Sequence, residues 1–320
     1  MKISYRHTIG WFFLLIAGCF PAAFQTGTAQ PDIYVAVENY RFGAFEDARA
    51  LSLSTDGRMT VVDGGAGAVI RLDQTGKIER SLDGKGWGQL EFDQPVDGDA
   101  NPPLRTYIAD YGNARIQIFD QTLNFVATLD GRSLENDGYR FRYPRSIAIS
   151  RHNDIFVLDG DNARIVKIDI SGVLQIAFGG FDAGKGRLLD PSRIRISSND
   201  VLGVIDRNDV LFFDLYGNYL SRYEGQGLVR ACAPFTSDSR WIVATDSGVT
   251  IVDPDPDDTG TGCTMTGNIL FEFSGGSPVG QGVNTKPVFI HLIRDIVARE
   301  NSMYVLTNRE IVVWSIAYRK

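Results

Sequence analysis

Histidine and cysteine are both scarce in this chain, which has three of each among 320 residues. A zinc site of the three-histidine type needs more than His152 and His291, the two histidines outside the N-terminal segment, and these lie in different sequence contexts. A Ser-His-Asp arrangement is disfavoured for the same reason. We therefore expect His152 to be a solvated turn residue and His291 to be a packed or strand-edge residue.

The chain also lacks an excess of positive charge, because its formal net charge is −7. Proteins that bind nucleic acids need a basic track along the phosphate backbone. We therefore expect no nucleic-acid partner. No amphipathic helix or further apolar segment outside the N-terminus indicates membrane insertion, so we expect membrane contact only through a lipid anchor.

The first 30 residues resemble a segment that is removed on export. Lys2 and Arg6 give a basic start, the apolar stretch at 9–20 is short for a membrane span, and small residues at 27–29 suit a cleavage site. These features predict a signal peptide at 1–30 and a mature domain at 31–320. The protein is then periplasmic or secreted.

A second interpretation of the same segment is lipidation. Residues 16–19 read IAGC, which resembles a bacterial lipobox. In that case the signal ends at residue 18, and Cys19 carries the anchor of an outer-membrane lipoprotein. The apolar residues that follow Cys19 suit a solvated tether poorly, so soluble export is the first expectation.

In a soluble mature protein the remaining cysteines are Cys232 and Cys263. An even pair in an oxidising compartment is a candidate disulfide. Closing that loop of about 30 residues would stabilise the fold by roughly 3 to 4 kcal/mol if the bridge is unstrained. The alternative is two buried free thiols.

Two segments of the chain repeat each other. Residues 107–120 read YIADYGNARIQIFD, and residues 156–169, which lie 49 positions later, read FVLDGDNARIVKID. An apolar run that ends in Asp, a turn with Asn and Arg, and a second alternating run predict a β-hairpin. A period of about 40 to 50 residues gives one four-stranded sheet per repeat, and such sheets stack radially into a β-propeller.

The aspartate that ends the first strand of this hairpin recurs along the chain. It stands at Asp63, Asp110, Asp159, Asp206 and Asp246, and Thr307 takes its place in the last unit. Six units result. Prolines at 95, 144, 191 and 287 precede units, as suits the first residue of an inner strand.

The orphan strand at 33–37 is expected to complete the sixth unit, because closing the ring removes exposed sheet edges. The sequence thus predicts an all-β fold, a six-bladed β-propeller of four-stranded antiparallel blades with the ring closed by the N-terminal strand.

The D-x-x-N-x-R-I segments at 110–116 and 159–165, with glycine-rich lead-ins at 84–90 and 179–184, resemble NHL-repeat six-bladed propellers of the exported bacterial type. The match is specific in the second and third units. The resemblance implies that the repeated side chains are chiefly turn and inter-blade structure. These are Asp110, Asn113, Arg115, Asp159, Asn162 and Arg164, with Asp63, Asp206 and Asp246 at the corresponding places.

Enzymes of the propeller class usually act at the central channel. Lactonase-like propellers bind Ca²⁺ there, and Asp97, Asp99 or Asn101 could supply the oxygen ligands. The acidic string DPDPDD at 253–258 has alternate carboxylates, but Thr264 stands where a calcium loop needs a bidentate Glu. A solvated acidic insertion is the expected role of that string.

Arginines recur near the start of the inner strand in five of the six units. They are Arg49, Arg145, Arg193, Arg230 and Arg294. Crowded guanidinium groups need a carboxylate partner or a bound anion. Either aspartates of neighbouring blades pair with them, or they form a binding site for an anionic ligand or an acidic partner segment. Strand parity decides which of them face the channel.

These observations favour a binding or interaction module of the cell envelope that has no tightly bound cofactor. Its partner would be a protein, peptide or glycan that engages the channel mouth and the top loops. The alternative is a Ca²⁺-dependent lactonase-like hydrolase or lyase that acts at the channel. Three or more converging carboxylate or Asn oxygens would favour the enzyme, and an arginine-lined or closed channel would favour the binder.

Overall fold

The computed structural model describes residues 33–102, 104–133, 140–169, 171–235, 239–254, 270–274 and 292–319. The predictions for residues 1–30 with Cys19, for residues 255–264 with Cys263, and for Pro287 and His291 concern positions outside these ranges. Within the described ranges, no helix is long and apolar enough to span a membrane. The described residues belong to one compact unit.

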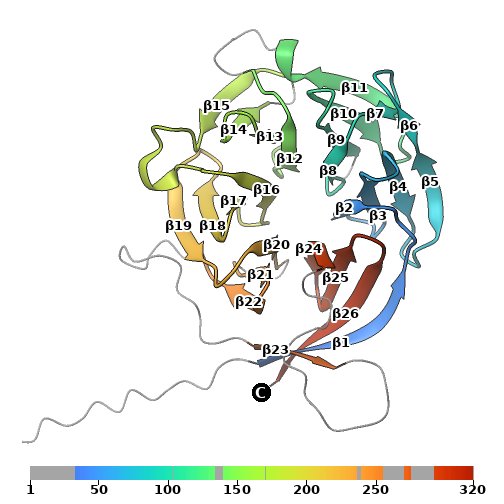
Figure 1. Ribbon diagram of the computed structural model, residues 1–320, viewed down its shortest axis with the longest axis vertical. Coiled ribbons are helices and arrows are strands. Elements are labelled where there is room, and N and C mark those ends of the chain that lie inside the picture. The colour runs from blue at the N-terminus through green and yellow to red at the C-terminus, as the bar shows by residue number, and fades with distance from the viewer. Residues whose placement is uncertain are drawn as a thin grey trace, which may run out of the picture. The chain divides into compact units, whose positions relative to one another are not determined.

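The strands are arranged as six blades around a central channel, and Figure 1 shows the ring face-on. The strands nearest the centre are β2, β8, β12, β16, β20 and β24. Blades 1 to 4 each have four antiparallel strands, in sequence order from the channel outwards. Blade 1 contains β2 (Ala48–Leu53), β3 (Met59–Asp63), β4 (Ala68–Leu72) and β5 (Ile78–Leu82). Blade 2 contains β8 (Pro95–Asp99), β9 (Arg105–Asp110), β10 (Arg115–Asp120) and β11 (Phe125–Asp130).

Blades 3 and 4 follow the same order. Blade 3 contains β12 (Pro144–Ile149), β13 (Ile155–Asp159), β14 (Arg164–Ile168) and β15 (Leu174–Phe178). Blade 4 contains β16 (Pro191–Ile196), β17 (Val201–Asp206), β18 (Asp209–Asp214) and β19 (Tyr219–Glu224). Pro95, Pro144 and Pro191 each begin an inner strand, as predicted, because that position needs no ladder N–H. The loop between blades 1 and 2 adds the short parallel pair β6 (Gly84–Lys85) and β7 (Glu91–Phe92).

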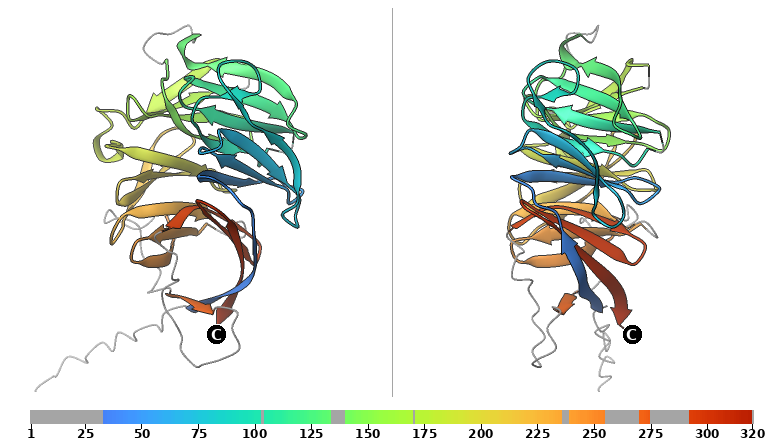
Figure 2. Two further views of the ribbon diagram at one scale, coloured as in Figure 1. Left: turned by 45° about the vertical axis from the view of Figure 1, so that its right-hand side comes forward. Right: turned by 90° about the vertical axis from the view of Figure 1, so that its right-hand side faces the viewer.

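Blades 5 and 6 close the ring. Blade 5 contains β20 (Val229–Pro234), β21 (Trp241–Thr245) and β22 (Gly248–Val252), and blade 6 contains β24 (Ile293–Arg299), β25 (Ser302–Thr307) and β26 (Ile311–Arg319). The N-terminal strand β1 (Ile33–Phe42) pairs antiparallel with β26 and completes blade 6, which confirms the predicted closure. Figure 2 shows β1 in blue beside β26 in red. The strand β23 (Leu270–Ser274) pairs in parallel with β1, so it extends blade 6.

The core is divided among the interfaces between neighbouring blades. One cluster joins blades 1 and 2 through Val62, Val69, Ile108 and Phe119, and comparable clusters of buried residues join each later pair, including blades 6 and 1. Alternating apolar residues on each strand supply both faces of a blade. Packing is tight at the interface of blades 4 and 5, where a Cβ on Gly203 would lie 2.6 Å from the ring of Trp241.

The repeated aspartates hold the loop that leads into their own blade. Asp63, Asp110, Asp159 and Asp206 each accept a backbone N–H from the residue 17 positions earlier. In blade 2 the other carboxylate oxygen of Asp110 accepts hydrogen bonds from Asn113 and Arg115, both at 2.8 Å. Asn162 and Arg164 do the same for Asp159 in blade 3. The motif therefore fixes the hairpin turn and the inter-blade loop.

Each inner strand carries a register shift at its second residue. The pairing skips Arg49, Val96, Arg145, Ser192, Arg230 and Arg294 in the six blades. A bulge of this kind changes which residues face the channel. The third and fifth residues of every inner strand then occupy equivalent positions around the ring.

Candidate functional site: the channel cavity

The third residues of the inner strands form the first layer of the channel. They are Ala50, Asp97, Ser146, Arg193, Ala231 and Asp295. The fifth residues form the second layer, which consists of Ser52, Asp99, Ala148, Arg195, Ala233 and Val297. Charged side chains therefore meet at the channel from blades 2, 4 and 6, although they are far apart in the sequence.

Two arginines and two aspartates form the channel hub, which we define as Asp97, Arg193, Arg195 and Asp295. Arg195 contacts both carboxylate oxygens of Asp97, at 3.1 and 3.3 Å, and a carboxylate oxygen of Asp295 at 2.6 Å. Arg193 pairs with Asp295 at 2.5 Å. Both aspartates are fully buried. The charges of the hub cancel, and its bonds cross the channel from one blade to another.

Neighbouring groups complete the hub. Ser146 donates a hydrogen bond to Asp97, and the backbone N–H of Leu51 donates to Asp295 at 3.0 Å. Burial opposes ionisation of Asp97, but Arg195 and Arg193 outweigh it and hold the pKa of Asp97 below its usual range. Burial likewise opposes the charge on Arg195, yet Asp295 and Asp97 raise the pKa of Arg195. Asp97 and Arg195 are therefore both charged at neutral pH.

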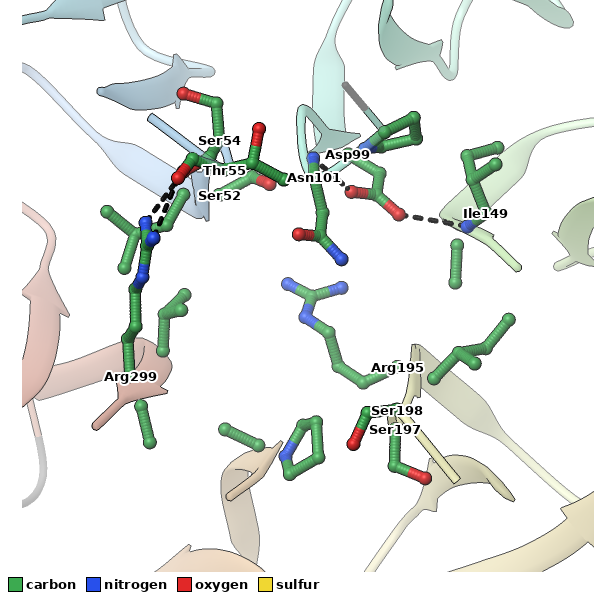
Figure 3. Close-up of a pocket in the computed structure, with 18 of the residues that line it drawn as sticks. Ser52, Ser54, Thr55, Asp99, Asn101, Ile149, Arg195, Ser197, Ser198 and Arg299 are labelled. Carbon is green, nitrogen blue, oxygen red and sulfur yellow. Dashed lines mark hydrogen bonds between the residues drawn. The ribbon is translucent and has the colours of Figure 1, made fainter. Parts of the chain in front are cut away.

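A cavity of about 650 Å³ opens above the hub, at the end of the channel where the inner strands terminate. Most of its wall is apolar and comes from residues such as Leu53, Ile149, Ile196 and Phe235. Arg195 reaches into it from β16, and Figure 3 shows its guanidinium facing the side-chain amide of Asn101. The cavity thus combines an apolar enclosure with a few polar groups, as small-molecule sites do.

Two charged residues of the cavity have no ion-pair partner among the described residues. Arg299 donates hydrogen bonds to the carbonyl oxygens of Ser54 and Thr55, at 3.0 and 2.7 Å. Asp99 accepts the backbone N–H groups of Asn101 and Ile149, both at 2.9 Å. Burial raises the pKa of Asp99, although these hydrogen bonds and Arg195 oppose the shift.

Four of the five predicted arginines lie at the opposite end of the channel, on the bulges where the inner strands begin. We call these four the arginine ring: Arg49, Arg145, Arg230 and Arg294. Their pairs are Arg49–Asp47, Arg145–Asp190, Arg230–Asp246 and Arg294–Asp47. The fifth, Arg193, lies one position farther along its strand and belongs to the hub. This pairing favours the structural role, although the partners are mostly lead-in aspartates and only Asp246 is a repeated one. A ligand role for this ring stays a prediction.

Arg195 engages both oxygens of Asp97, which makes this carboxylate a poor calcium ligand. Each oxygen of Asp99 accepts one backbone N–H and keeps a second lone pair, and the Asn101 side chain is uncommitted, so a calcium role for these residues stays a prediction. Within the described residues no group of three or more His, Cys, Asp or Glu side chains is placed to hold a metal ion. We derive no step through calcium.

The remaining predicted residues lie away from the cavity or beside the hub. His152 is exposed in the turn after β12, 3.6 Å from Asp200, which agrees with a solvated turn residue. Cys232 is fully buried on β20, and burial raises the pKa of its thiol to about 12. Its predicted bridge to Cys263 stays a prediction, because Cys263 lies outside the described residues.

Sequence reasoning missed Arg195, Asp295 and Arg299. A signal for the first two was present, because each is a charged residue at an inward position of an inner strand that otherwise alternates apolar residues. This signal can be recognised only when the bulge in each inner strand is known, because the bulge shifts the inward positions by one residue. Arg299 ends β24, and its sequence context alone gives no sign that it lines a cavity.

Comparisons with known proteins find partial similarity in sequence to one named lyase and similarity in fold to others. A search with the sequence against models of protein families finds no match. The chain is 30% identical over 135 residues to the probable peptidyl-alpha-hydroxyglycine alpha-amidating lyase pgal-1 of Caenorhabditis elegans. That segment covers 40% of this chain and 39% of the nematode protein, so the similarity spans about two fifths of each.

Among solved structures, virginiamycin B lyase from Staphylococcus aureus matches with a TM-score of 0.52 and 10% identity, over 88% of this chain and 99% of that chain. A streptogramin B lyase matches with a TM-score of 0.53 and 12% identity, over 90% and 98%. At this identity the likeness shows the fold, which is an all-β six-bladed propeller as predicted.

Proposed function

We propose that the protein is a ligand-binding module of the cell envelope and that its ligand occupies the cavity above the channel hub. The cavity carries this proposal. Its volume of about 650 Å³ suits a small ligand, its wall is mostly apolar, and the hub lies across the channel beneath it. The proposed location in the envelope depends on the N-terminal segment. The mass of the N-terminal peptide of the mature protein would distinguish cleavage near residue 30 from lipidation of Cys19.

A peptide-like molecule is the first ligand class to test. The C. elegans relative is named for a peptidyl substrate, and an apolar enclosure with polar groups at a few points suits a short peptide with apolar side chains. Propeller channels gather residues from every blade, so one small ligand could contact several blades at once. No nucleic-acid partner is proposed.

The test is thermal unfolding of the purified protein with a panel of short hydrophobic peptides. A ligand at 100 times its Kd raises the free energy of unfolding by about 2.7 kcal/mol. Ser198 lines the cavity and is exposed, so Ser198→Trp should fill the opening and abolish the shift. Ser192→Trp is the matched control, because Ser192 is exposed at the start of β16, at the opposite end of the channel from Ser198 in the turn after β16.

The proposal fails if no peptide of the panel stabilises the protein, or if Ser198→Trp responds as strongly as the control does. Binding that Ser192→Trp alone abolishes would instead place the ligand at the arginine ring.

A lyase is the second candidate function, and the similarity to the C. elegans protein favours it. An elimination needs a base that is placed beside the substrate, and Asp99 is a carboxylate of the cavity with a raised pKa. We would incubate the protein with a peptidyl-α-hydroxyglycine, with Ca²⁺ or with EDTA, and follow the peptide amide by mass spectrometry. Product that disappears in Asp99→Asn supports the lyase, and absence of product in every arm contradicts it.

A further inference from the structure

We propose that the cavity selects a zwitterionic ligand, with the cationic group beside Asp99 and the anionic group beside Arg299. The inference rests on the proposed ligand-binding function and names the ligand's chemistry. A free short peptide or an amino acid with an apolar side chain belongs to this class.

The charges that carry the inference lie on different sides of one cavity. Asp99 comes from blade 2 and Arg299 from blade 6, and Figure 3 shows them on opposite sides of the view, with the guanidinium of Arg195 below Asn101. Neither has an ion-pair partner among the described residues. A charge that is partly removed from water is stabilised by a counter-charge, so each of these side chains favours a ligand group of opposite sign.

The other charged groups near the cavity are already balanced. Arg195 pairs with Asp97 and Asp295, and Arg193 also pairs with Asp295, so the two positive and two negative charges of the hub cancel. Arg151, at the edge of the cavity, pairs with Asp200 at 2.6 Å. The charges of the cavity that lack an ion-pair partner among the described residues are therefore Asp99 and Arg299, one negative and one positive, and a ligand with a single charge would satisfy only one of them.

Both side chains keep capacity for a ligand. Each oxygen of Asp99 accepts one backbone N–H and has a second lone pair. Arg299 uses one N–H of each terminal nitrogen on the carbonyls of Ser54 and Thr55, and a guanidinium has five N–H groups. The contacts to these carbonyls also fix the orientation of Arg299, which lowers the entropy lost on binding.

The apolar wall explains why the ligand should carry an apolar side chain. Leu53, Ile149, Phe235 and Val297 line the cavity from blades 1, 3, 5 and 6. An apolar group of the ligand that is buried against them contributes in proportion to its area removed from water. The charged ends of the ligand then determine which ligands the cavity accepts, and the apolar side chain of the ligand increases the affinity.

The experiment is calorimetric titration of the purified protein with four forms of one dipeptide. These are Leu-Leu, N-acetyl-Leu-Leu, Leu-Leu amide and N-acetyl-Leu-Leu amide, which are zwitterionic, anionic, cationic and neutral. We expect Leu-Leu to bind most tightly and the loss of either charge to weaken binding by about 10- to 100-fold. Free leucine, tested in parallel, shows whether the source of the zwitterion is an amino acid or a peptide.

Two variants assign the charges. Arg299→Gln should weaken Leu-Leu and leave Leu-Leu amide unchanged, because that ligand has no carboxylate to lose. Asp99→Asn should weaken Leu-Leu and leave N-acetyl-Leu-Leu unchanged. Arg145→Gln removes a cation at the opposite end of the channel and is the matched control, expected to bind all four forms as the wild type does.

The outcomes separate this inference from the function beneath it. Equal binding of all four forms, or tightest binding of a singly charged form, overturns the zwitterion inference and leaves the ligand-binding function standing. Absence of binding by every form and by the wider peptide panel overturns both. The comparison of the four forms uses the wild-type protein, so it decides the inference even if Asp99→Asn does not fold.

Discussion

The two ends of the channel treat charge differently. Where the inner strands begin, Arg49, Arg145, Arg230 and Arg294 are partly exposed and pair with nearby aspartates. Where the strands terminate, Arg299 and Asp99 lie in a cavity without ion-pair partners among the described residues. Paired surface charges satisfy each other and need no ligand, whereas charges without ion-pair partners beside an apolar enclosure are available to a charged ligand. The two ends of the channel therefore differ in whether their charged side chains have ion-pair partners, and this difference matters more than the number of charges at each end.

The hub between the ends should give the largest effect on stability. Asp295→Asn would leave Arg193 and Arg195 with one carboxylate between them in a buried site, and we expect a loss of about 3 to 5 kcal/mol in the free energy of unfolding. Denaturant unfolding measures it. Asp190→Asn, which removes the exposed partner of Arg145, is the control and should cost at most about 1 kcal/mol. Equal losses would show that the hub is no more desolvated than the arginine ring.

The cysteine beside the hub gives the next effect. If Cys232 and Cys263 form the predicted disulfide, reduction should lower the free energy of unfolding by roughly 3 to 4 kcal/mol. Peptide mapping without reductant shows whether the bridge exists. If it does not, burial and the raised pKa of about 12 predict that Cys232 resists alkylation until the protein unfolds. Rapid alkylation of Cys232 in the native protein would contradict its burial beside the hub.

Acid should weaken the hub. The pKa of Asp97 is lower in the folded protein than its ordinary value of 3.8, so its contribution is present above pH 3.8 and is lost as the pH falls through the folded pKa. The difference in stability between wild type and Asp97→Asn should therefore shrink below pH 3.8, by at most about 1.4 kcal/mol per pH unit. Asp56 and Asp120 have pKa values of about 2 and titrate in both proteins, so their effects on stability cancel in the difference between wild type and Asp97→Asn. A constant difference down to pH 2 would contradict the assignment.

The arginine ring should give the smallest effect. Arg145→Gln removes a half-exposed ion pair and should change the free energy of unfolding by about 0 to 1 kcal/mol. Thermal unfolding with a panel of small anions tests whether the ring also binds a ligand. A stabilisation by one anion that Arg145→Gln abolishes would support the ligand role and would remove the contrast between the two ends.

Much of the architecture could be predicted because it depends on local sequence. Asp110, Asn113 and Arg115 determine one hairpin turn and the loop before it, and their recurrence at Asp159, Asn162 and Arg164 gives the repeat. Period-2 alternation identified the strands, and an orphan strand at the N-terminus predicted that β1 completes blade 6. The pairing of β23 with β1 was not predicted, since the local sequence of a strand does not identify a pairing partner that is far away in the chain.

The sequence by itself determined that this chain forms a ring of β-sheets, because turn residues, strand alternation and the repeat length are all properties of neighbouring residues. Only the tertiary structure decided which charges meet. Asp97, Arg195 and Asp295 come together from three blades, and a bulge in each inner strand sets which residues face the channel. Contacts across the ring join residues about 100 positions apart, and a shift of one residue in register turns a side chain from the channel to the blade. The site is therefore a property of the closed ring.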